Sequence, residues 1–422
     1  MLKKLRKSDF IGSVATLVSG TIIAQLFTYV LSPLITRLYT SEDMSYQSVF
    51  ARIVALLAII ATARFELAFA LPKRFEHAYS LYRFSFRILI IVVLICFVAA
   101  TFFLVFPLED KILNSIFLLV PIGVLLSALY NQGMNWAVRL KDYKRISYSK
   151  ITQSLSNSSL SVALYPMGAF GLITAFLLSM FSSTLLFVRD FKFAKKYMKS
   201  FKMKGRDFAI ARSFADFPRI NLPHALVDVT KELFIAIYMV YAFEKGVLGL
   251  YDLSFRMLKL PISIIGSSIG QVFLKKAVDQ RNEGKPIYPL LKKTMLMLLL
   301  ISLVPFTLLM IFGADIFAFV FGSNWEKAGF YAQIMAPWLM INFLISPVSQ
   351  VPLILNKQRG FFILGITSAI LMILSLTIGE LFPSFHFSFD QILIIVSASQ
   401  FVFLTFVIFW LLRLAKKNDE HA

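Results

Sequence analysis

Cysteine, histidine and acidic side chains are all scarce in this chain. Of its 422 residues, one is cysteine and four are histidine, and 23 Asp and Glu face 43 Lys and Arg. The single cysteine, Cys96, excludes an intramolecular disulfide and a cysteine-based metal cluster. The histidines are too scattered for a metal site, and they are His77, His224, His386 and His421. We therefore expect no metal and no other cofactor.

Charged residues are also few, and the patterns of soluble enzymes are missing. Charged residues make up 16% of the chain, against about 25% in a soluble globular protein. The sequence has no P-loop, no Rossmann glycine pattern and no H-E-x-x-H motif. Hydrophobic residues reach 58%, which also excludes a disordered chain. We therefore predict that the protein is not an enzyme.

Long apolar segments are abundant, and they predict an all-α polytopic membrane protein. A membrane helix needs about 20 apolar residues, and twelve segments fit that length with short connections. We predict transmembrane helices over roughly 11–36, 45–71, 84–107, 112–138, 149–166, 169–189, 218–243, 247–274, 289–313, 327–354, 360–382 and 391–412.

The basic residues lie almost entirely on one predicted side of the membrane. With the N-terminus inside, the cytoplasmic segments hold 33 Lys and Arg and the opposite side holds four. This asymmetry follows the positive-inside rule and supports an even number of spans. Both termini are therefore predicted to be cytoplasmic. The net charge of +20 has the same explanation, so we expect no nucleic-acid partner.

A basic loop near the middle of the chain divides the predicted spans into two groups of six. We predict an N-terminal half over 1–190, a basic cytoplasmic linker over 191–217 and a C-terminal half over 218–422. Segments 45–52 and 249–256 show a weak internal match that gives Arg52 and Arg256 equivalent places. Transporters are often built from such repeats. We therefore expect twelve helices in two six-helix halves around a central cavity.

Charged residues within the predicted spans are candidates for a binding site, because a charge at the bilayer centre costs about 2.5 to 3.5 kcal/mol. Span eight carries Arg256 and Lys259 on one polar face. Its members recur at helical spacing, and they are Asp252, Arg256, Lys259, Ser263, Ser267 and Gln271. Arg87 lies near the cytoplasmic end of span three, so we expect it to extend to the aqueous phase. A cationic cavity suits an anionic cargo.

Span seven carries a second polar face, and two interpretations of it are open. The face comprises Asn221, His224, Asp228 and Lys231, with Glu232 beside it. It either lines a wet cavity or holds two helices together through a neutralised pair of Asp228 and Lys231.

Neutral polar residues gather in spans one, four and five. Gln25 belongs to a stripe in span one, and Asn131 and Asn135 belong to one in span four. Either these residues line the cavity, or they hold helices together, as small polar residues do in membranes.

Arg64 and Glu66 lie near the inner end of span two. Two residues apart on a helix, their side chains point in nearly opposite directions. We therefore expect that they do not pair with each other and that each needs another partner or water.

Several stretches of the sequence resemble those of one membrane-protein family. The opening TLVSGTIIAQ (16–25) and SPLITRLY (32–39) resemble the start of polysaccharide-biosynthesis membrane proteins, the Wzx-type O-antigen flippases. These belong to the multidrug/oligosaccharidyl-lipid/polysaccharide exporter superfamily. Further similar stretches are ATARFELA (61–68) with LPK (71–73), the fourth span with its following loop (131–144), LGLY (248–251) and LPISIIGSSIGQVF (260–273). The charges of span seven match no motif of that family.

The resemblance implies a flippase in the bacterial inner membrane. Its cargo would be an O-antigen or capsule repeat unit, an oligosaccharide linked to undecaprenyl diphosphate. The protein would move this cargo from the cytoplasmic to the periplasmic leaflet by alternating access. Its partners would be the lipid-linked oligosaccharide, membrane lipids, and the polymerase and chain-length proteins of the same pathway.

Two sets of residues are therefore candidates for transport roles. We expect the first to bind the cargo headgroup, and it comprises Arg52, Lys231, Arg256, Lys259, Asn131, Asn135 and Gln25. We expect the second to serve ion coupling or gating, and it comprises Glu66, Arg64, His224, Asp228 and Asp252. The alternative functions are a cation-coupled multidrug antiporter of the same fold and, less favoured by the sequence, a membrane-embedded glycan-assembly enzyme.

Overall fold

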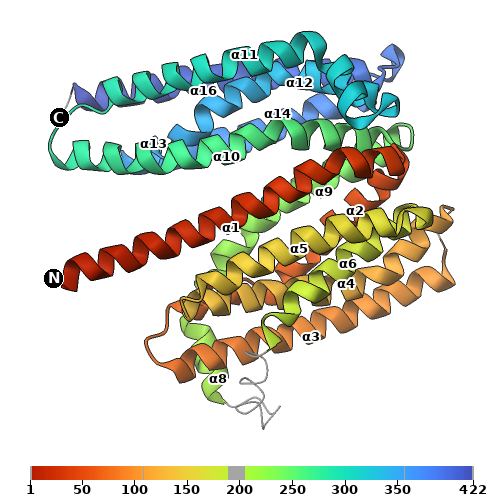
Figure 1. Ribbon diagram of the computed structural model, residues 1–422, viewed down its shortest axis with the longest axis horizontal. Helices are drawn as coiled ribbons and strands as arrows, with labels where there is room; N and C mark the ends of the chain where they lie inside the picture. Colours follow the sequence, from red (N-terminus) through yellow and green to blue (C-terminus); the bar gives the residue numbers. More distant parts are fainter. Residues whose placement is uncertain (1, 108, 189–204, 356, 421–422) are drawn as a thin grey trace. The chain divides into compact units, whose positions relative to one another are not determined.

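The protein is all-helical in the part of the chain that its computed structural model describes, residues 2–107, 109–188, 205–355 and 357–420 (Figure 1). No strand occurs in these ranges. Among the described residues, eight helical segments are long and apolar enough to cross a membrane. The prediction of an all-α polytopic membrane protein is thereby confirmed. Residues 189–204, which hold most of the predicted basic linker, lie outside the described residues.

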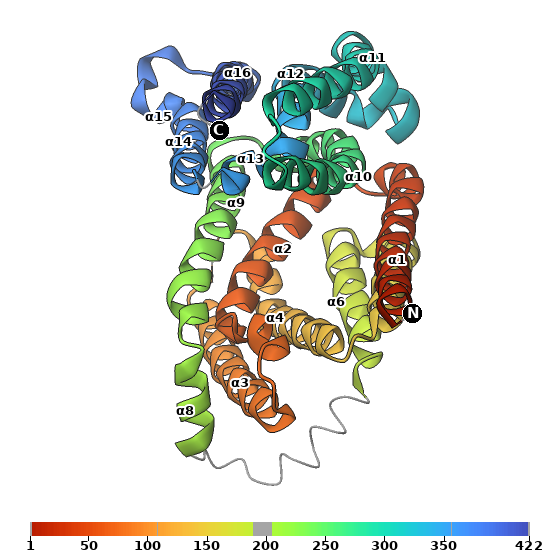
Figure 2. The ribbon, with the colours of Figure 1, turned by 90° about the vertical axis from the view of Figure 1, so that its left-hand side faces the viewer.

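The chain forms two compact units, residues 1–248 and 249–422. The first unit contains the following elements: α1 (Leu2–Leu38), α2 (Ser41–Thr62), η1 (Phe65–Ala70), α3 (Phe75–Val105), α4 (Lys111–Arg139), α5 (Tyr143–Ala163), η2 (Tyr165–Met167), α6 (Ala169–Leu185), α8 (Gly205–Ser213), η3 (Phe217–Asn221) and α9 (Leu222–Ala242). Within it, α8 and α9 follow one another along the same side (Figure 2).

The second unit begins within α10 (Val247–Asn282) and contains the remaining elements. They are α11 (Tyr288–Phe321), η4 (Ser323–Trp325), α12 (Glu326–Ile345), η5 (Ser346–Val348), α13 (Val351–Ile354), α14 (Gln358–Leu376), α15 (Ile378–Leu381), η6 (Pro383–Phe385) and α16 (Phe389–Asp419). Compactness therefore groups α9 with the first unit. The predicted division into two sets of six spans concerns an internal repeat, and it stays a prediction.

Each of the twelve predicted spans overlaps a helix. Helix α6 is 17 residues long, one short of the length of a membrane span. Helices α5 and α9 are long enough, but their polar and charged residues keep them outside the composition of a membrane span, and they correspond to predicted spans five and seven.

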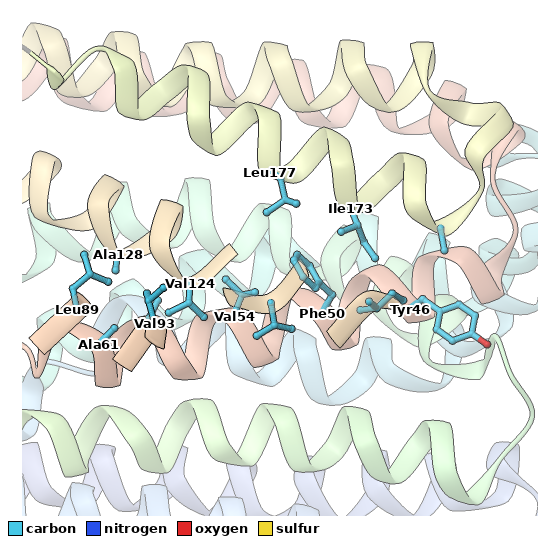
Figure 3. Packing of buried hydrophobic residues seen from close by; sticks show 14 residues of the cluster. Tyr46, Phe50, Val54, Ala61, Leu89, Val93, Val124, Ala128, Ile173 and Leu177 are labelled. Atoms are coloured by element: carbon cyan, nitrogen blue, oxygen red, sulfur yellow. The ribbon is translucent and has the colours of Figure 1, made fainter. Parts of the chain in front are cut away.

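The cores of both units consist of interlocking aliphatic and aromatic side chains. In the first unit, buried residues of α2, α3, α4 and α6 meet, among them Phe50, Val54, Leu89 and Ile173 (Figure 3). Helices α2 and α4 approach closely at Gly123, where a Cβ atom would lie 2.7 Å from the Val54 side chain. Small residues permit such contacts between membrane helices.

The second unit has its own core between α10, α11, α12 and α16. Its closest helix contact joins α11 to α12 at two glycines. A Cβ atom on Gly329 would lie 2.3 Å from the carbonyl oxygen of Gly313. No side chain fits at that distance, so glycine at position 329 permits this packing.

Contacts within the first unit place its loops at two opposite ends. The loops that follow spans one, three and seven meet, because Lys245 lies 3.0 Å from Asp110 and Gly246 packs against Ser41. At the other end, Arg139 at the end of α4 donates to the carbonyl of Phe69 in η1. This alternation agrees with the predicted order of spans, while the orientation in the membrane stays a prediction.

Candidate functional site

The predicted cationic residues of span eight lie on an exposed face of α10. Arg256 and Lys259 are both exposed, and Asp252 is half-buried one turn before Arg256. The Lys259 ammonium lies 4.7 Å from the centroid of the Phe255 ring. That ring stacks on Trp338 of α12 at 6.0 Å. A cation over an aromatic face is attracted to it, so the stacked rings of Phe255 and Trp338 stabilise the position of the Lys259 ammonium. No carboxylate pairs with Lys259 in the described ranges.

A pocket with a volume of about 510 Å³ lies beside this face, entirely within the second unit. Its lining residues come from α10 and from the turn between α12 and α13, and they are Lys259, Ile262, Ser263, Gly266, Gly270, Leu274, Ser346, Pro347 and Gln350. The predicted polar face of α10 thus contributes Lys259 and Ser263. Neither Ser346 nor Gln350 was predicted, because nothing in the sequence indicates that their turn faces α10.

Arg52, the predicted counterpart of Arg256, is a half-buried residue of α2 in the first unit. Its guanidinium donates to the hydroxyl of Ser48 one turn earlier. Arg52 lies between Phe50 and Val54 in the sequence of α2, and both of those residues are fully buried in the core of the first unit. The side chain therefore has a polar partner on its own helix.

Arg64 and Glu66 form an ion pair, so the prediction that they do not pair is wrong. Arg64 Nη1 lies 3.7 Å from Glu66 Oε1. Helix α2 ends at Thr62, and Ala63 and Arg64 adopt positive φ values of 47° and 61°. The separation expected on a continuous helix therefore does not apply. Glu66 is only 3% exposed, and its Oε2 atom has no hydrogen-bond partner among the described residues.

The charged residues of span seven lie on α9. Asp228 and Lys231 pair with each other across 3.8 Å, and the Asp228 side chain is 70% exposed. The pair joins two positions of one helix, so it does not hold two helices together. His224 and Glu232 are exposed as well. This arrangement argues against the interpretation of a helix-joining pair, and the lining of a wet cavity by this face stays a prediction.

The polar stripe of span one faces α5 and holds the two helices together. The hydroxyls of Thr28 and Ser154 lie 2.8 Å apart, and Ser154 donates to the Ala24 carbonyl at 2.5 Å. Lys150 donates to the Thr21 hydroxyl at 3.0 Å. Gln25 belongs to the same stretch and is half-buried. Thr21 and Thr28 of α1 therefore make contacts between helices.

Span four contributes two half-buried asparagines and a structural junction. Asn135 Nδ2 donates to the Asn131 carbonyl at 2.9 Å, so the Asn135 amide group forms a hydrogen bond within its own helix. One turn on, Arg139 donates to the carbonyls of Phe69 and Pro72 at 2.7 and 3.0 Å. Trp136 packs against the Phe69 ring. Two of the stretches that resemble the flippase family thus meet at the end of α2.

Arg87 does not extend to the aqueous phase as expected, because α8 covers it. Arg83 Nη2 lies 2.6 Å and Arg87 Nη1 lies 3.4 Å from the carboxylate of Asp207, which is fully buried. Neither Arg83 nor Asp207 was predicted from the sequence. Their signal is the spacing of Arg83 and Arg87, which puts both on one helix face and suggests a shared carboxylate.

A second network that was not predicted from the sequence joins three segments at one end of the first unit. Asp110 accepts hydrogen bonds from the Tyr46 hydroxyl at 2.6 Å and from Lys245 Nζ at 3.0 Å. It also caps α4 through the backbone N–H groups of Ile112 and Leu113. Burial raises the pKa of Asp110, but these hydrogen bonds outweigh it and lower that pKa to about 2.

A metal site finds no support in the geometry that the structure describes. In the described ranges, no three His, Cys, Asp or Glu side chains come close enough to hold an ion.

Comparisons with known proteins identify the family and the fold. The model of the family described as polysaccharide biosynthesis protein matches residues 34–329. The fold resembles that of the lipid II flippase MurJ in an inward closed conformation, with a TM-score of 0.68, 14% identity, and coverage of 92% of this chain and 87% of that one. No curated protein matches by sequence.

Multidrug transporters share the fold. An inward-facing MATE family transporter of the MOP superfamily gives a TM-score of 0.61 at 15% identity, covering 94% of this chain and 99% of that one. A single-residue mutant of the Vibrio cholerae MATE transporter VcmN gives 0.55 at 13% identity, with coverage of 97% and 96%. At these identities the likeness shows a common fold of membrane transporters.

Proposed function

The chain belongs to the polysaccharide biosynthesis protein family, and from this membership we propose that it is a lipid-linked oligosaccharide flippase. It moves an oligosaccharide on undecaprenyl diphosphate from the cytoplasmic to the periplasmic leaflet of a bacterial inner membrane by alternating access. Both termini lie in the cytoplasm. The cargo is an O-antigen or capsule repeat unit, and polymerase and chain-length proteins act on it next.

The cationic face of α10 is the observation that carries this proposal. Arg256 and Lys259 are exposed on one helix in a segment otherwise rich in apolar residues. Charges are costly in a membrane segment and mark substrate pathways. A diphosphate presents two negative charges with many acceptor oxygens, which Arg and Lys bind through charge-assisted hydrogen bonds. The proposed role of α10 is therefore to bind the diphosphate.

Five residues of the first unit are proposed as further residues that bind the cargo headgroup. Arg52 and Lys231 supply positive charge, and Asn131, Asn135 and Gln25 supply hydrogen bonds to sugar hydroxyls. The half-buried state of all five supports a role in a partly desolvated site, where a hydrogen bond to a charged group is worth about 1.5 to 3 kcal/mol.

The membrane potential favours outward movement of an anionic cargo. Moving one charge through 100 mV is worth about 2.3 kcal/mol, so a headgroup of charge −2 gains about 5 kcal/mol. Ion coupling is a further proposal, with Glu66, Arg64, His224, Asp228 and Asp252 as candidate residues. An export rate that is unchanged when the proton and sodium gradients are collapsed separately contradicts the coupling proposal.

A complementation experiment tests the role of α10. The double variant Arg256→Ala/Lys259→Ala is expected to restore less than a tenth of surface polysaccharide in a strain that lacks the protein, because losing two contacts to a charged group costs about 3 kcal/mol or more. The matched control is Lys275→Ala/Lys276→Ala, which removes the same charge from exposed positions further along α10. Full restoration by the first variant, at equal expression, refutes the proposed role of α10.

A multidrug antiporter is the second candidate function, favoured by the fold shared with MATE transporters. Vesicles that contain the purified protein discriminate between the two. Uptake of a cationic dye driven by an ion gradient supports antiport, whereas movement of a lipid-linked saccharide between leaflets supports the flippase. A glycan-assembly enzyme would instead turn over a radiolabelled nucleotide sugar.

A further inference from the structure

The pocket beside α10 combines two kinds of wall. The polar part of the lining comes from Lys259, Ser263, Ser346 and Gln350. The remaining wall is apolar, formed mainly by Ile262, Leu274 and Pro347. Its volume of about 510 Å³ falls in the range of small-ligand sites, roughly 300 to 1,000 Å³. Such a pocket is large enough for a part of the cargo headgroup.

The polar groups of the pocket are available to a ligand. In the described part of the chain, the side chains of Ser346 and Gln350 make no hydrogen bond, and Gln350 is exposed. The Ser263 hydroxyl donates to the Leu260 carbonyl and keeps its capacity to accept. A prenyl chain would leave these groups without partners, which is costly away from water. The composition therefore favours a ligand that offers hydroxyls together with apolar C–H surface.

Two glycines of α10 determine the width of the pocket. A Cβ atom on Gly270 would lie 3.3 Å from the Pro347 backbone, so the walls nearly meet there. At Gly266 the nearest atom would be Ser346 Oγ at 3.5 Å, an ordinary contact distance. Space between α10 and Ser346 therefore exists because position 266 has no side chain. A longer side chain at that position fills it.

We propose that this pocket binds the sugar attached to the diphosphate of the cargo, and that Ser346 and Gln350 select that sugar. The proposal rests on the proposed function, since Lys259 of the pocket lining is the residue assigned to the diphosphate. The sugar hydroxyls bond to Ser263, Ser346 and Gln350, and its C–H face packs on Ile262 and Pro347. The pocket starts about 18 Å along α10 from Val247 and continues for about 22 Å, toward the predicted cytoplasmic side, where the lipid-linked sugar is made.

Matched ligands separate the sugar from the anion. The probes are farnesyl diphosphate and the same molecule carrying one hexose or one N-acetylhexosamine, titrated calorimetrically against the full-length protein in detergent. We expect the unmodified protein to bind at least one glycosylated probe about tenfold more tightly than farnesyl diphosphate, as about two extra hydrogen bonds predict. The variant Ser346→Ala/Gln350→Ala should lose most of that preference and keep its affinity for farnesyl diphosphate.

Two further variants identify the roles of Lys259 and the glycine. Lys259→Ala should weaken all probes by a similar factor, because it acts on the diphosphate. Gly266→Leu should abolish the preference for the glycosylated probe by filling the pocket. Its control is Gly365→Leu on α14, where an added Cβ meets no atom within 4 Å, and this variant should keep the preference. Unfolding temperatures of both leucine variants show whether each is folded.

The outcomes distinguish this proposal from the proposed function. Equal affinity of the unmodified protein for all probes, or a preference that survives Ser346→Ala/Gln350→Ala, overturns the sugar pocket and leaves the flippase proposal standing. No binding of farnesyl diphosphate at all, combined with full complementation by Arg256→Ala/Lys259→Ala, overturns both. Both proposals are supported if the unmodified protein prefers a glycosylated probe and only the variants Ser346→Ala/Gln350→Ala and Gly266→Leu lose that preference.

Discussion

At the scale of single residues, buried charges in this protein come with partners that bring distant segments together. Asp207 accepts from two arginines of α3, 124 and 120 positions away in the sequence. Asp110 joins the start of α4, the first turns of α2 and the segment after α9. A buried ion pair stabilises little beyond an apolar replacement, but removing one partner is strongly destabilising. These residues are therefore the points where a single substitution should matter most.

Replacing Asp207 by Asn should strongly destabilise the first unit. The change leaves Arg83 and Arg87 without a carboxylate in a site that excludes water, which costs about 3 to 5 kcal/mol. The measurement is thermal unfolding in detergent, in which the variant should have a lower unfolding midpoint than the unmodified protein. The control is Asp216→Asn, because Asp216 is exposed and has no ion pair among the described residues. Equal midpoints for the two variants would show that α8 does not depend on this ion pair.

Stability should also depend on pH through Asp110. Its folded pKa of about 2 lies below its ordinary value, which is about 3.9. A lowered pKa means that the folded state is stabilised by the charged form. This contribution is complete above about pH 4 and is lost as the pH falls toward 2.

The measurement is the unfolding midpoint as a function of pH. Unmodified protein should lose stability between about pH 4 and pH 2, and Asp110→Asn should flatten that part of the profile. Glu109→Gln, at the exposed neighbouring position, should leave it unchanged. A profile that Asp110→Asn does not alter would contradict the assignment. The Lys245 pKa is raised by its hydrogen bond to Asp110, so this pair should persist at alkaline pH until Lys245 titrates.

At the scale of elements, the helices within each unit approach one another most closely where their side chains are small. Gly329 and Gly313 bring α11 against α12, and Gly20 of α1 packs on Ser147 of α5, where a Cβ would lie 2.4 Å from the serine Cβ. The hydroxyl contacts of Thr28 and Ser154 follow along the same interface. Close approach adds dispersion contacts and short hydrogen bonds, which drive helix association where apolar burial cannot.

Gly329→Ala should separate α11 from α12 and destabilise the second unit. The added Cβ would lie 2.3 Å from the Gly313 carbonyl and 2.6 Å from Ala314 Cα, so the helix backbones must move. We expect a loss of about 1 to 3 kcal/mol, the usual cost of overpacking. Gly365→Ala makes the same change in α14 where nothing lies within 4 Å, and its unfolding midpoint should be unchanged or higher. Similar midpoints for both variants would contradict the packing argument.

At the scale of the whole molecule, the chain is a multi-pass membrane protein with alternating helices. Loops after spans one, three and seven of the first unit meet at one end, and those after spans two and four meet at the other. Basic residues concentrate in the second set of loops. Charge asymmetry determines orientation, so the end that carries Lys245 should face the periplasm.

Reporter fusions test this orientation. Alkaline phosphatase, active only outside the cytoplasm, should be active when fused after Lys245 and inactive when fused after Gly284 or at the C-terminus. Green fluorescent protein should show the opposite pattern, because it becomes fluorescent in the cytoplasm. Phosphatase activity after Gly284 would invert the proposed topology and the direction of transport with it.

Much of the fold was predictable from the sequence. Apolar length and the distribution of Lys and Arg are local properties of the chain, and in a membrane they nearly determine where helices lie, because an unpaired backbone is too costly in lipid. The predicted spans therefore overlap helices, and the polar faces of α9 and α10 were visible from spacing alone. Glycines at helix contacts, such as Gly329, could not be recognised from the sequence, because the residues that they contact are not nearby in the sequence.

The tertiary structure decided which polar residue meets which. The left-handed turn at Ala63 and Arg64 brings Arg64 to Glu66, α8 covers Arg87 with Asp207, and the turn after α12 brings Ser346 and Gln350 to Lys259. Each of these contacts depends on a change of chain direction or on a segment far away in the sequence. Helical periodicity describes one continuous element, so the sequence determined which faces are polar and only the folded chain determined their partners.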